Sequence, residues 1–232
     1  MIPWLAPESP FPLLHTALTQ PNGLLAAGGG LSPQRLIEAY RHGIFPWFSE
    51  GEPILWWSPD PRTVLFPREL KISRSLGKVL KKESYEIRID TAFDQVMHAC
   101  AAPRKGSAGT WIHKEMISAY SLLHQMGFAH SVETWLDGDL KGGLYGIALG
   151  KAFFGESMFS RASNASKVAF VHLVRQLDRR GFGLIDCQMK TPLLASFGAR
   201  EITRREFSQK LEELVNYPGP DRKWCSDHEQ VE

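Results

Sequence analysis

The chain has 232 residues, 43% of them hydrophobic and 22% charged, a composition typical of a globular protein with a substantial core. Its formal net charge of +2 is too small to indicate general attraction to polyanions, so nucleic-acid binding would need a local basic patch. Because the apolar runs are short or interrupted by charges and residues 1–14 lack the features of a secretion signal, we expect no membrane attachment and a cytoplasmic location.

Residues 1–62 are predicted to form a small N-terminal α/β domain. Residues 21–32 (PNGLLAAGGGLS) are interpreted as a glycine-rich connection. Ser32 as N-cap and Gly43 past the last turn bracket a predicted helix. Residues 43–62 carry aromatic side chains on both sides of a polar turn, a pattern that predicts an aromatic hairpin.

Residues 63–232 are predicted to form a larger domain that ends in a polar tail from Pro218. Its expected elements are strand 63–66, helix 73–82, strand 86–90, helices 92–101 and 113–125, strands 129–135, 140–149 and 152–158, helix 164–180, strand 183–188, helices 192–196 and 205–216, and strand 200–203 between them. Three antiparallel strands, a crossing helix and a strand beside the third resemble the GNAT acyltransferase core, in which two central strands splay around the acyl donor. The expected fold class is therefore α+β, GNAT-like, with a mostly antiparallel central sheet.

Acidic residues occur on two predicted core strands. Glu156 lies near the end of one strand, and Asp186 and Gln188 share a face of the next because side chains in a strand repeat every second residue. An ionised carboxylate is costly to bury unless it is paired or used by a ligand. Two interpretations remain open: a cleft that handles amine groups, or an internal salt bridge to Arg161 or another basic residue. Cys187 would point to the opposite face, so no cysteine nucleophile is expected.

The remaining cysteines, Cys100 and Cys225, complete no disulfide set or metal-binding motif, and the eight histidines lack ligand spacing, so we expect no metal. In the predicted helix 73–82, four basic residues share one face: Arg74, Lys78, Lys81 and Lys82. A solvated face and a surface for a polyanion are both open. Trp47 and Trp111 lie in loop-like context and are expected either to stack on a nucleobase or to pack. The link 160–164 has no glycine to cradle a pyrophosphate, which disfavours coenzyme A.

Eight motifs occur in order between Asn22 and Arg205: PNGLLA, GIFPWF, PILWWSPDPR, ISRS, GTWI, GGLYG, FGESMFSR and LIDCQ. Together they resemble the bacterial leucyl/phenylalanyl-tRNA protein transferases. The resemblance implies transfer of Leu or Phe, and less efficiently Met, from aminoacyl-tRNA to the N-terminal Arg or Lys of proteins, which marks them for degradation. We also expect a monomer, although the sequence does not reveal the oligomeric state, and no cofactor besides the aminoacyl-tRNA co-substrate. An acetyl-CoA-dependent GNAT acetyltransferase and a non-enzymatic tRNA-binding adaptor remain as alternatives.

The resemblance also implies roles for individual residues. Asp186 and Gln188 match the catalytic pair of the family, and Glu156 matches a carboxylate that holds the acceptor or the terminal adenosine. Positions near the aminoacyl-adenosine are Trp47, Trp111, Leu144, Met158, Ser160, Leu173 and Ile185, and those contacting the tRNA acceptor stem are Arg74, Lys78, Lys81 and Lys82. Leu144 and Leu173 stand where Met or an aromatic residue is often found, so the preference between Leu and Phe is open. Asp186 is expected to take the proton of the attacking amine, directly or through Gln188, and Asp186→Asn to lower transfer without affecting folding.

Overall fold

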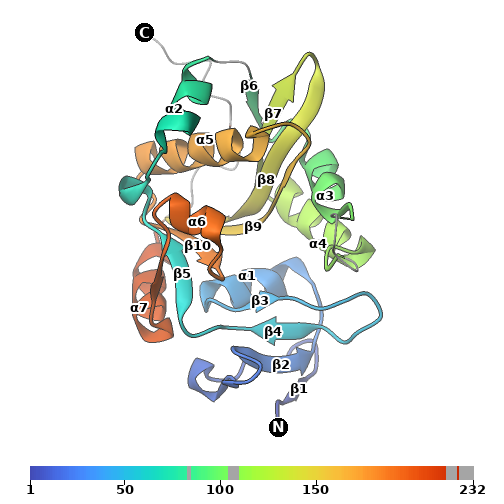
Figure 1. The fold of residues 1–232 in the computed structure, drawn as a ribbon. Coiled ribbons are helices and arrows are strands. Elements are labelled where there is room, and N and C mark those ends of the chain that lie inside the picture. Colours follow the sequence, from blue (N-terminus) through green and yellow to red (C-terminus); the bar gives the residue numbers. More distant parts are fainter. Residues whose placement is uncertain (83–84, 104–109, 218–223, 225–232) are drawn as a thin grey trace.

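The computed structural model describes residues 1–82, 85–103, 110–217 and 224, which form two β-sheets and the helices packed on them (Figure 1). This confirms the predicted α+β class. The smaller sheet has the order β1 (Trp4–Leu5), β2 (Leu24–Gly28), β4 (Leu55–Trp57) and β3 (Phe45–Pro46). The larger has the order β11 (Arg200–Ile202), β5 (Arg62–Leu65), β10 (Leu184–Gln188), β9 (Ala152–Ser160), β8 (Asp139–Leu149), β7 (Ala129–Leu136) and β6 (Glu86–Ile89).

The smaller sheet contains two strands that the sequence did not predict, β1 and β2. Residues 21–32 are more than a connection, because β2 pairs parallel with β1 and antiparallel with β4. Leu25, Ala26 and Ala27 are all buried, so this strand has no polar face to produce an alternating pattern. The predicted helix is confirmed as α1 (Pro33–Arg41), with the Ser32 side chain accepting a hydrogen bond from the Arg35 N–H. The predicted hairpin is confirmed by the antiparallel pairing of β3 and β4.

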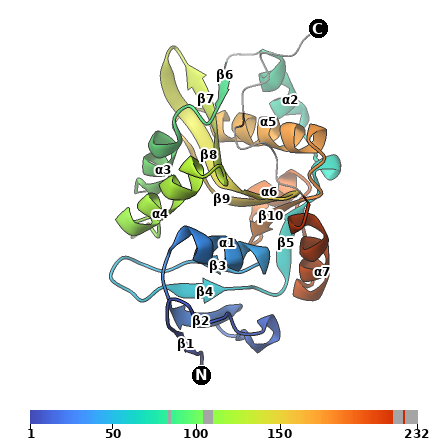
Figure 2. The same ribbon diagram turned by 180° about the vertical axis from the view of Figure 1, so that it is seen from behind.

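The larger sheet carries helices on both faces (Figures 1 and 2). α5 (Ala165–Arg179) packs on one face, and α3 (Phe93–Ala101) and α4 (Lys114–Gln125) pack on the other. The remaining helices are α2 (Arg74–Lys81), α6 (Pro192–Ser196), α7 (Arg204–Val215) and the short 3-10 turns Leu14–Thr16 and Pro67–Glu69. All strand pairs of this sheet are antiparallel except β9 with β10. None of the described helices is long and apolar enough to span a membrane.

The two sheets share one hydrophobic core. Buried side chains of the N-terminal segment, including Tyr40 and Phe45, belong to the same cluster as Tyr120 and Phe154 of the larger unit. Figure 2 shows α1 lying between the smaller sheet and the larger unit. The polar tail predicted from Pro218 lies outside the described residues except for Trp224. Cys225 also lies outside them. Trp224 is buried, and its ring stacks on His130 with centroids 4.0 Å apart.

Candidate active site

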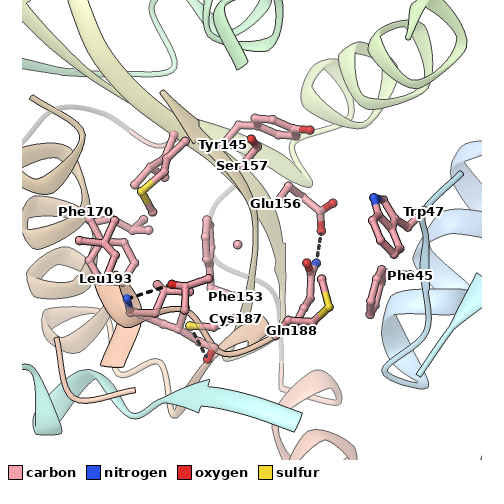
Figure 3. A pocket seen from close by; sticks show the side chains of 18 of the residues that line it. Phe45, Trp47, Tyr145, Phe153, Glu156, Ser157, Phe170, Cys187, Gln188 and Leu193 are labelled. Atoms are coloured by element: carbon pink, nitrogen blue, oxygen red, sulfur yellow. Dashed lines mark hydrogen bonds between the residues drawn. The ribbon is translucent and has the colours of Figure 1, made fainter. Parts of the chain in front are cut away.

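A pocket opens where β9 and β10 separate (Figure 3). The two strands pair at Leu184 with Ala152, Ile185 with Phe153 and Asp186 with Phe154. Beyond these pairs β9 continues along β8, while β10 ends at Gln188. The gap leads into a pocket of about 480 Å³, bordered by β3, β8, β9, β10, α5 and α6. Separation of two neighbouring strands therefore creates a concave site without breaking the sheet elsewhere.

Apolar side chains line the wall of this pocket on the α5 side. They are Leu144, Phe153, Met158, Phe170, Leu173 and Ile185, together with Leu193 and Leu194 from α6. Three aromatic side chains also line the pocket: Phe45 on β3, Trp47 directly after β3, and Trp111. The Trp47 side chain is 40% exposed, so its ring reaches solvent at the mouth. The wall suits an apolar side chain, and the mouth offers aromatic rings.

Glu156 carries the polar chemistry of the pocket. Its Oε1 accepts hydrogen bonds from the Tyr40 hydroxyl at 2.8 Å and from Gln188 Nε2 at 3.1 Å, and its Oε2 accepts one from the Tyr120 hydroxyl at 3.2 Å. The two tyrosine hydroxyls also lie within hydrogen-bonding distance of each other. Burial raises the pKa of Glu156 to about 7, and the hydrogen bonds from both tyrosines, which favour the ionised form, offset this only in part. Glu156 can therefore gain or lose a proton near neutral pH.

Asp186 does not reach the pocket. It is fully buried, and its Oδ1 and Oδ2 accept hydrogen bonds from Arg62 Nε at 2.8 Å and Nη2 at 2.6 Å. The expectation that its carboxylate stands in the cleft is wrong, and the salt-bridge alternative holds, with Arg62 as the partner. Arg161 instead donates to the Leu140 carbonyl. Because Asp186 is fully buried and does not line the pocket, its carboxylate has no direct path to a substrate amine.

The backbone turns sharply at Gln188, which changes the predicted orientation of the side chains. Gln188 has a φ of 61°, and the Met189 N–H donates to the Cys187 carbonyl at 2.7 Å. Strict alternation ends here, so Cys187 and Gln188 both line the pocket, although the strand pattern predicts them on opposite faces. Burial raises the pKa of the Cys187 thiol, which disfavours the thiolate that a nucleophile needs.

The structure brings most of the residues predicted for catalysis and for aminoacyl-adenosine binding together, with two exceptions. Trp47, Trp111, Leu144, Glu156, Met158, Leu173, Ile185 and Gln188 all line the pocket. Asp186 lies behind it, and the exposed Ser160 lies at the end of β9, where its Oγ donates to the Ala162 carbonyl. The basic residues Arg74, Lys78, Lys81 and Lys82 are exposed on and just after α2, which packs against α5.

Sequence reasoning missed three residues that shape this site. Tyr40 and Tyr120 lie on apolar helix faces, and nothing in their spacing indicates that both hydroxyls meet one carboxylate. The available signal is chemical, because a buried tyrosine hydroxyl needs a hydrogen-bond partner. Arg62 falls at the predicted domain boundary, although an arginine entering a buried strand similarly requires an anionic partner.

Comparison with known proteins gives one consistent family. A sequence model of leucyl/phenylalanyl-tRNA protein transferase matches residues 64–212, and a model of the N-terminal domain of the same transferase matches residues 29–60. Proteins named leucyl/phenylalanyl-tRNA–protein transferase are 74% identical in Nitrosospira multiformis, over all of both chains, and 69% identical in Nitrosomonas europaea, over 98% of this chain and 96% of the relative. A solved structure of L-PGS from Bacillus licheniformis has 12% identity and a TM-score of 0.39 over 77% of this chain and 62% of that one, a similarity from which neither fold nor function follows.

Proposed function

This chain belongs to the leucyl/phenylalanyl-tRNA protein transferase family and transfers amino acids from aminoacyl-tRNA to proteins, and from this premise we propose that it delivers Leu, Phe and, less efficiently, Met to proteins with N-terminal Arg or Lys. The new N-terminus would mark the acceptor protein for degradation. The observation that carries this proposal is the pairing of Glu156 and Gln188 inside an otherwise largely apolar pocket.

We also propose a GNAT-like catalytic domain over residues 63–232, preceded by a small domain over residues 1–62. The strand separation between β9 and β10 supports the GNAT-like assignment, because an acyl donor can enter between splayed strands. We propose that the protein acts in the cytoplasm as a monomer, with no metal and no cofactor besides aminoacyl-tRNA.

The proposed reaction joins the acceptor α-amine to the carbonyl carbon of the aminoacyl ester. A C–N bond forms, the ester C–O bond breaks, and the terminal hydroxyl of the tRNA leaves with a proton. Because the ester is already activated and a free α-amine has a pKa of about 7.7–8.0, the protein must supply mainly positioning and one deprotonation. In this proposal Glu156 takes the proton of the attacking amine, and the Gln188 amide steadies the amine or the oxyanion. Asp186 acts through Gln188 rather than as the base.

A transfer assay tests the proposal directly. The protein is incubated with leucyl-tRNA and a peptide beginning with Arg, and the peptide mass should increase by one leucyl residue. An otherwise identical peptide beginning with Glu should remain unchanged. Acetyl transfer from acetyl-CoA to the Arg peptide, or tRNA binding without any transfer, would contradict the proposal and select one of its two rivals.

The aminoacyl side chain is proposed to occupy the apolar wall formed by Leu144, Met158, Leu173 and Ile185. Replacing Leu173 with Phe should reduce the space beside this wall and lower the ratio of phenylalanyl to leucyl transfer by roughly ten-fold. The reason is that one methylene in an apolar pocket changes selectivity by about 10- to 200-fold. The measurement is competition between equal amounts of both charged tRNAs, read by product mass. Leu122→Phe, on the exposed surface of α4, is the matched control and should keep the wild-type ratio. An unchanged ratio in Leu173→Phe would remove this residue from donor selection.

The tRNA is proposed to bind Arg74, Lys78, Lys81 and Lys82 through its phosphates. Replacing Lys81 and Lys82 with Ala should raise the KM for leucyl-tRNA. The slope of log KM against log salt concentration should fall by about 0.7–0.9 for each phosphate that the variant no longer neutralises. The control replaces Lys114 and Lys210, on α4 and α7, and should keep the wild-type slope. The same slope in both double variants would mean that the α2 residues form only a solvated face.

A further inference from the structure

The backbone of Gln188 has a conformation that non-glycine residues seldom adopt. Its φ of 61° and the hydrogen bond from the Met189 N–H to the Cys187 carbonyl define a three-residue turn centred on Gln188. Such γ-turns with positive φ are rare and strained. Strained backbone persists only where the surrounding structure holds it, and it concentrates at functional sites. The turn at Gln188 therefore needs a support.

Asp186 supplies that support from two positions earlier. Its Oδ1 accepts a hydrogen bond from the Gln188 N–H at 2.9 Å. The pairing with β5 is irregular at the same point, since Asp186 pairs with Val64 and Gln188 with Thr63. One residue, Cys187, is thus unpaired, as in a β-bulge. The shape of the turn depends on where the Asp186 carboxylate is held.

Arg62 holds this carboxylate from the neighbouring strand. The bidentate contact leaves Arg62 and Asp186 with at most 1% of their side chains exposed. The guanidinium carbon lies 4.8 Å from the ring centroid of Phe45 and 4.7 Å from that of Phe207. Because these rings come from β3 and α7, residues from three parts of the chain fix the guanidinium in a planar, two-pronged geometry that a lysine cannot reproduce.

The turn directs the Gln188 amide into the pocket. In a regular strand, residue 188 would point to the same side as Asp186, which is buried outside the pocket. With the turn, Gln188 Nε2 reaches Glu156 Oε1 at 3.1 Å (Figure 3). Glu156 and Gln188 therefore meet because the strand ends in this conformation.

We propose that Arg62 is a positioning residue for aminoacyl transfer: together with Asp186 it holds the turn at Gln188 and keeps the Gln188 amide against Glu156, without touching either substrate. The catalytic part rests on the function proposed for Glu156 and Gln188. The conformational part depends only on the contacts of Arg62, Asp186 and Gln188.

The variant Arg62→Lys tests the proposal, because it keeps the positive charge and removes the two-pronged contact. We expect kcat to fall by about 10²-fold, the scale of a misplacement near 1 Å in a catalytic site. The KM for leucyl-tRNA should stay near the wild-type value, because the pocket wall and α2 are unchanged. In a crystal structure of the variant, Gln188 should leave positive φ and no longer donate to Glu156. If Arg62→Lys does not fold, the neutral double variant Arg62→Met/Asp186→Leu serves the same test, since it too lacks a fixed acceptor for the Gln188 N–H.

Arg35→Lys is the matched control. Arg35 is also a buried arginine, with 4% of its side chain exposed and its guanidinium over the Phe11 ring, but it lies outside the pocket. Its replacement should leave kcat unchanged. A wild-type kcat in Arg62→Lys would overturn the proposal, as would a loss of kcat with the Gln188 turn and its bond to Glu156 intact. If the wild-type protein transfers nothing from leucyl-tRNA, the function proposed for Glu156 and Gln188 fails, whereas the Gln188 conformation in the variant crystals still decides the supporting role of Arg62.

Discussion

Glu156→Gln is expected to lower kcat for aminoacyl transfer by about 10²- to 10⁴-fold, the usual contribution of a general acid or base. Gln keeps the shape of the side chain and can still bond with Tyr40, Tyr120 and Gln188, but it cannot take a proton. The KM for leucyl-tRNA should change little, because the apolar wall and the basic residues of α2 are intact. Steady-state kinetics with an Arg-initiated peptide measures both quantities.

The pH dependence of the wild-type protein gives a second readout for Glu156. Burial raises the pKa of Glu156 to about 7, and the base is active when ionised, so kcat should rise as the pH increases through about 7. The residual kcat of Glu156→Gln should lack the part of this rise near pH 7 and keep only a rise at about pH 7.7–8.0, where the acceptor amine itself loses its proton. A wild-type profile in the variant, or a kcat within a few-fold of wild type, would show that another group accepts the proton.

The same carboxyl group should make the protein less stable at higher pH. A pKa raised from 4.5 to about 7 means that the folded state holds the proton more tightly than the unfolded state does. Glu156 therefore lowers the free energy of unfolding as the pH rises through this window, by at most roughly 3 kcal/mol. Unfolding by urea at several pH values should show the decline in the wild-type protein and a smaller decline in Glu156→Gln.

Breaking the buried pair of Arg62 and Asp186 should cause the largest loss of stability. Arg62→Met or Asp186→Asn leaves an uncompensated group in the interior, which typically costs about 3–5 kcal/mol. For a chain of this size that corresponds to a fall in Tm of roughly 6–20 °C. The double variant Arg62→Met/Asp186→Leu should recover most of the loss, because an apolar pair of similar volume often replaces a buried ion pair without cost. The measurement is the Tm of the wild-type protein, the two single variants and the double variant, which together form a double-mutant cycle.

An exposed ion pair provides the comparison for this cycle. Arg88 and Glu86 also form a two-pronged contact, but their side chains are 36% and 55% exposed. Solvent screens such pairs, so Arg88→Met should change Tm far less than Arg62→Met. Equal effects of the two replacements would contradict the burial argument. Asp186→Asn is thus expected to lower stability as well as transfer, in contrast to the expectation from sequence that folding would be unaffected.

Local patterns predicted most of the fold because their physical causes are local. Caps such as Ser32 and the period of the apolar residues define helices and strands to within one or two residues, as for α5 and β10. β2 was missed because burial on both faces removes the alternation that identifies a strand. The resemblance of the eight motifs to those of a known family identified most residues of the pocket. The hydrogen bonds and pKa values of these residues depend on contacts between segments that are distant in the sequence, which the motifs do not reveal.

The ion-pair partner of Asp186 and the turn that follows it could not be predicted from the sequence. Strand periodicity correctly separated Asp186 from Cys187, but its partner Arg62 lies 124 positions earlier and no local pattern links the two. The turn at Gln188 is equally hidden, since positive φ is predicted from glycine or asparagine and not from glutamine. Both features follow from tertiary contacts that outweigh local preference.

The order of strands in the larger sheet has a consequence for synthesis on the ribosome. β10 lies between β5 and β9 but follows both in the sequence, so this inner strand of the sheet is added after its two neighbours. Tyr40 is synthesised before Glu156, and both are synthesised before Gln188. A growing polypeptide therefore does not hold the complete proposed catalytic centre until Gln188 has left the exit tunnel, and a truncated product that ends before β10 is expected to be inert toward the charged tRNAs around it.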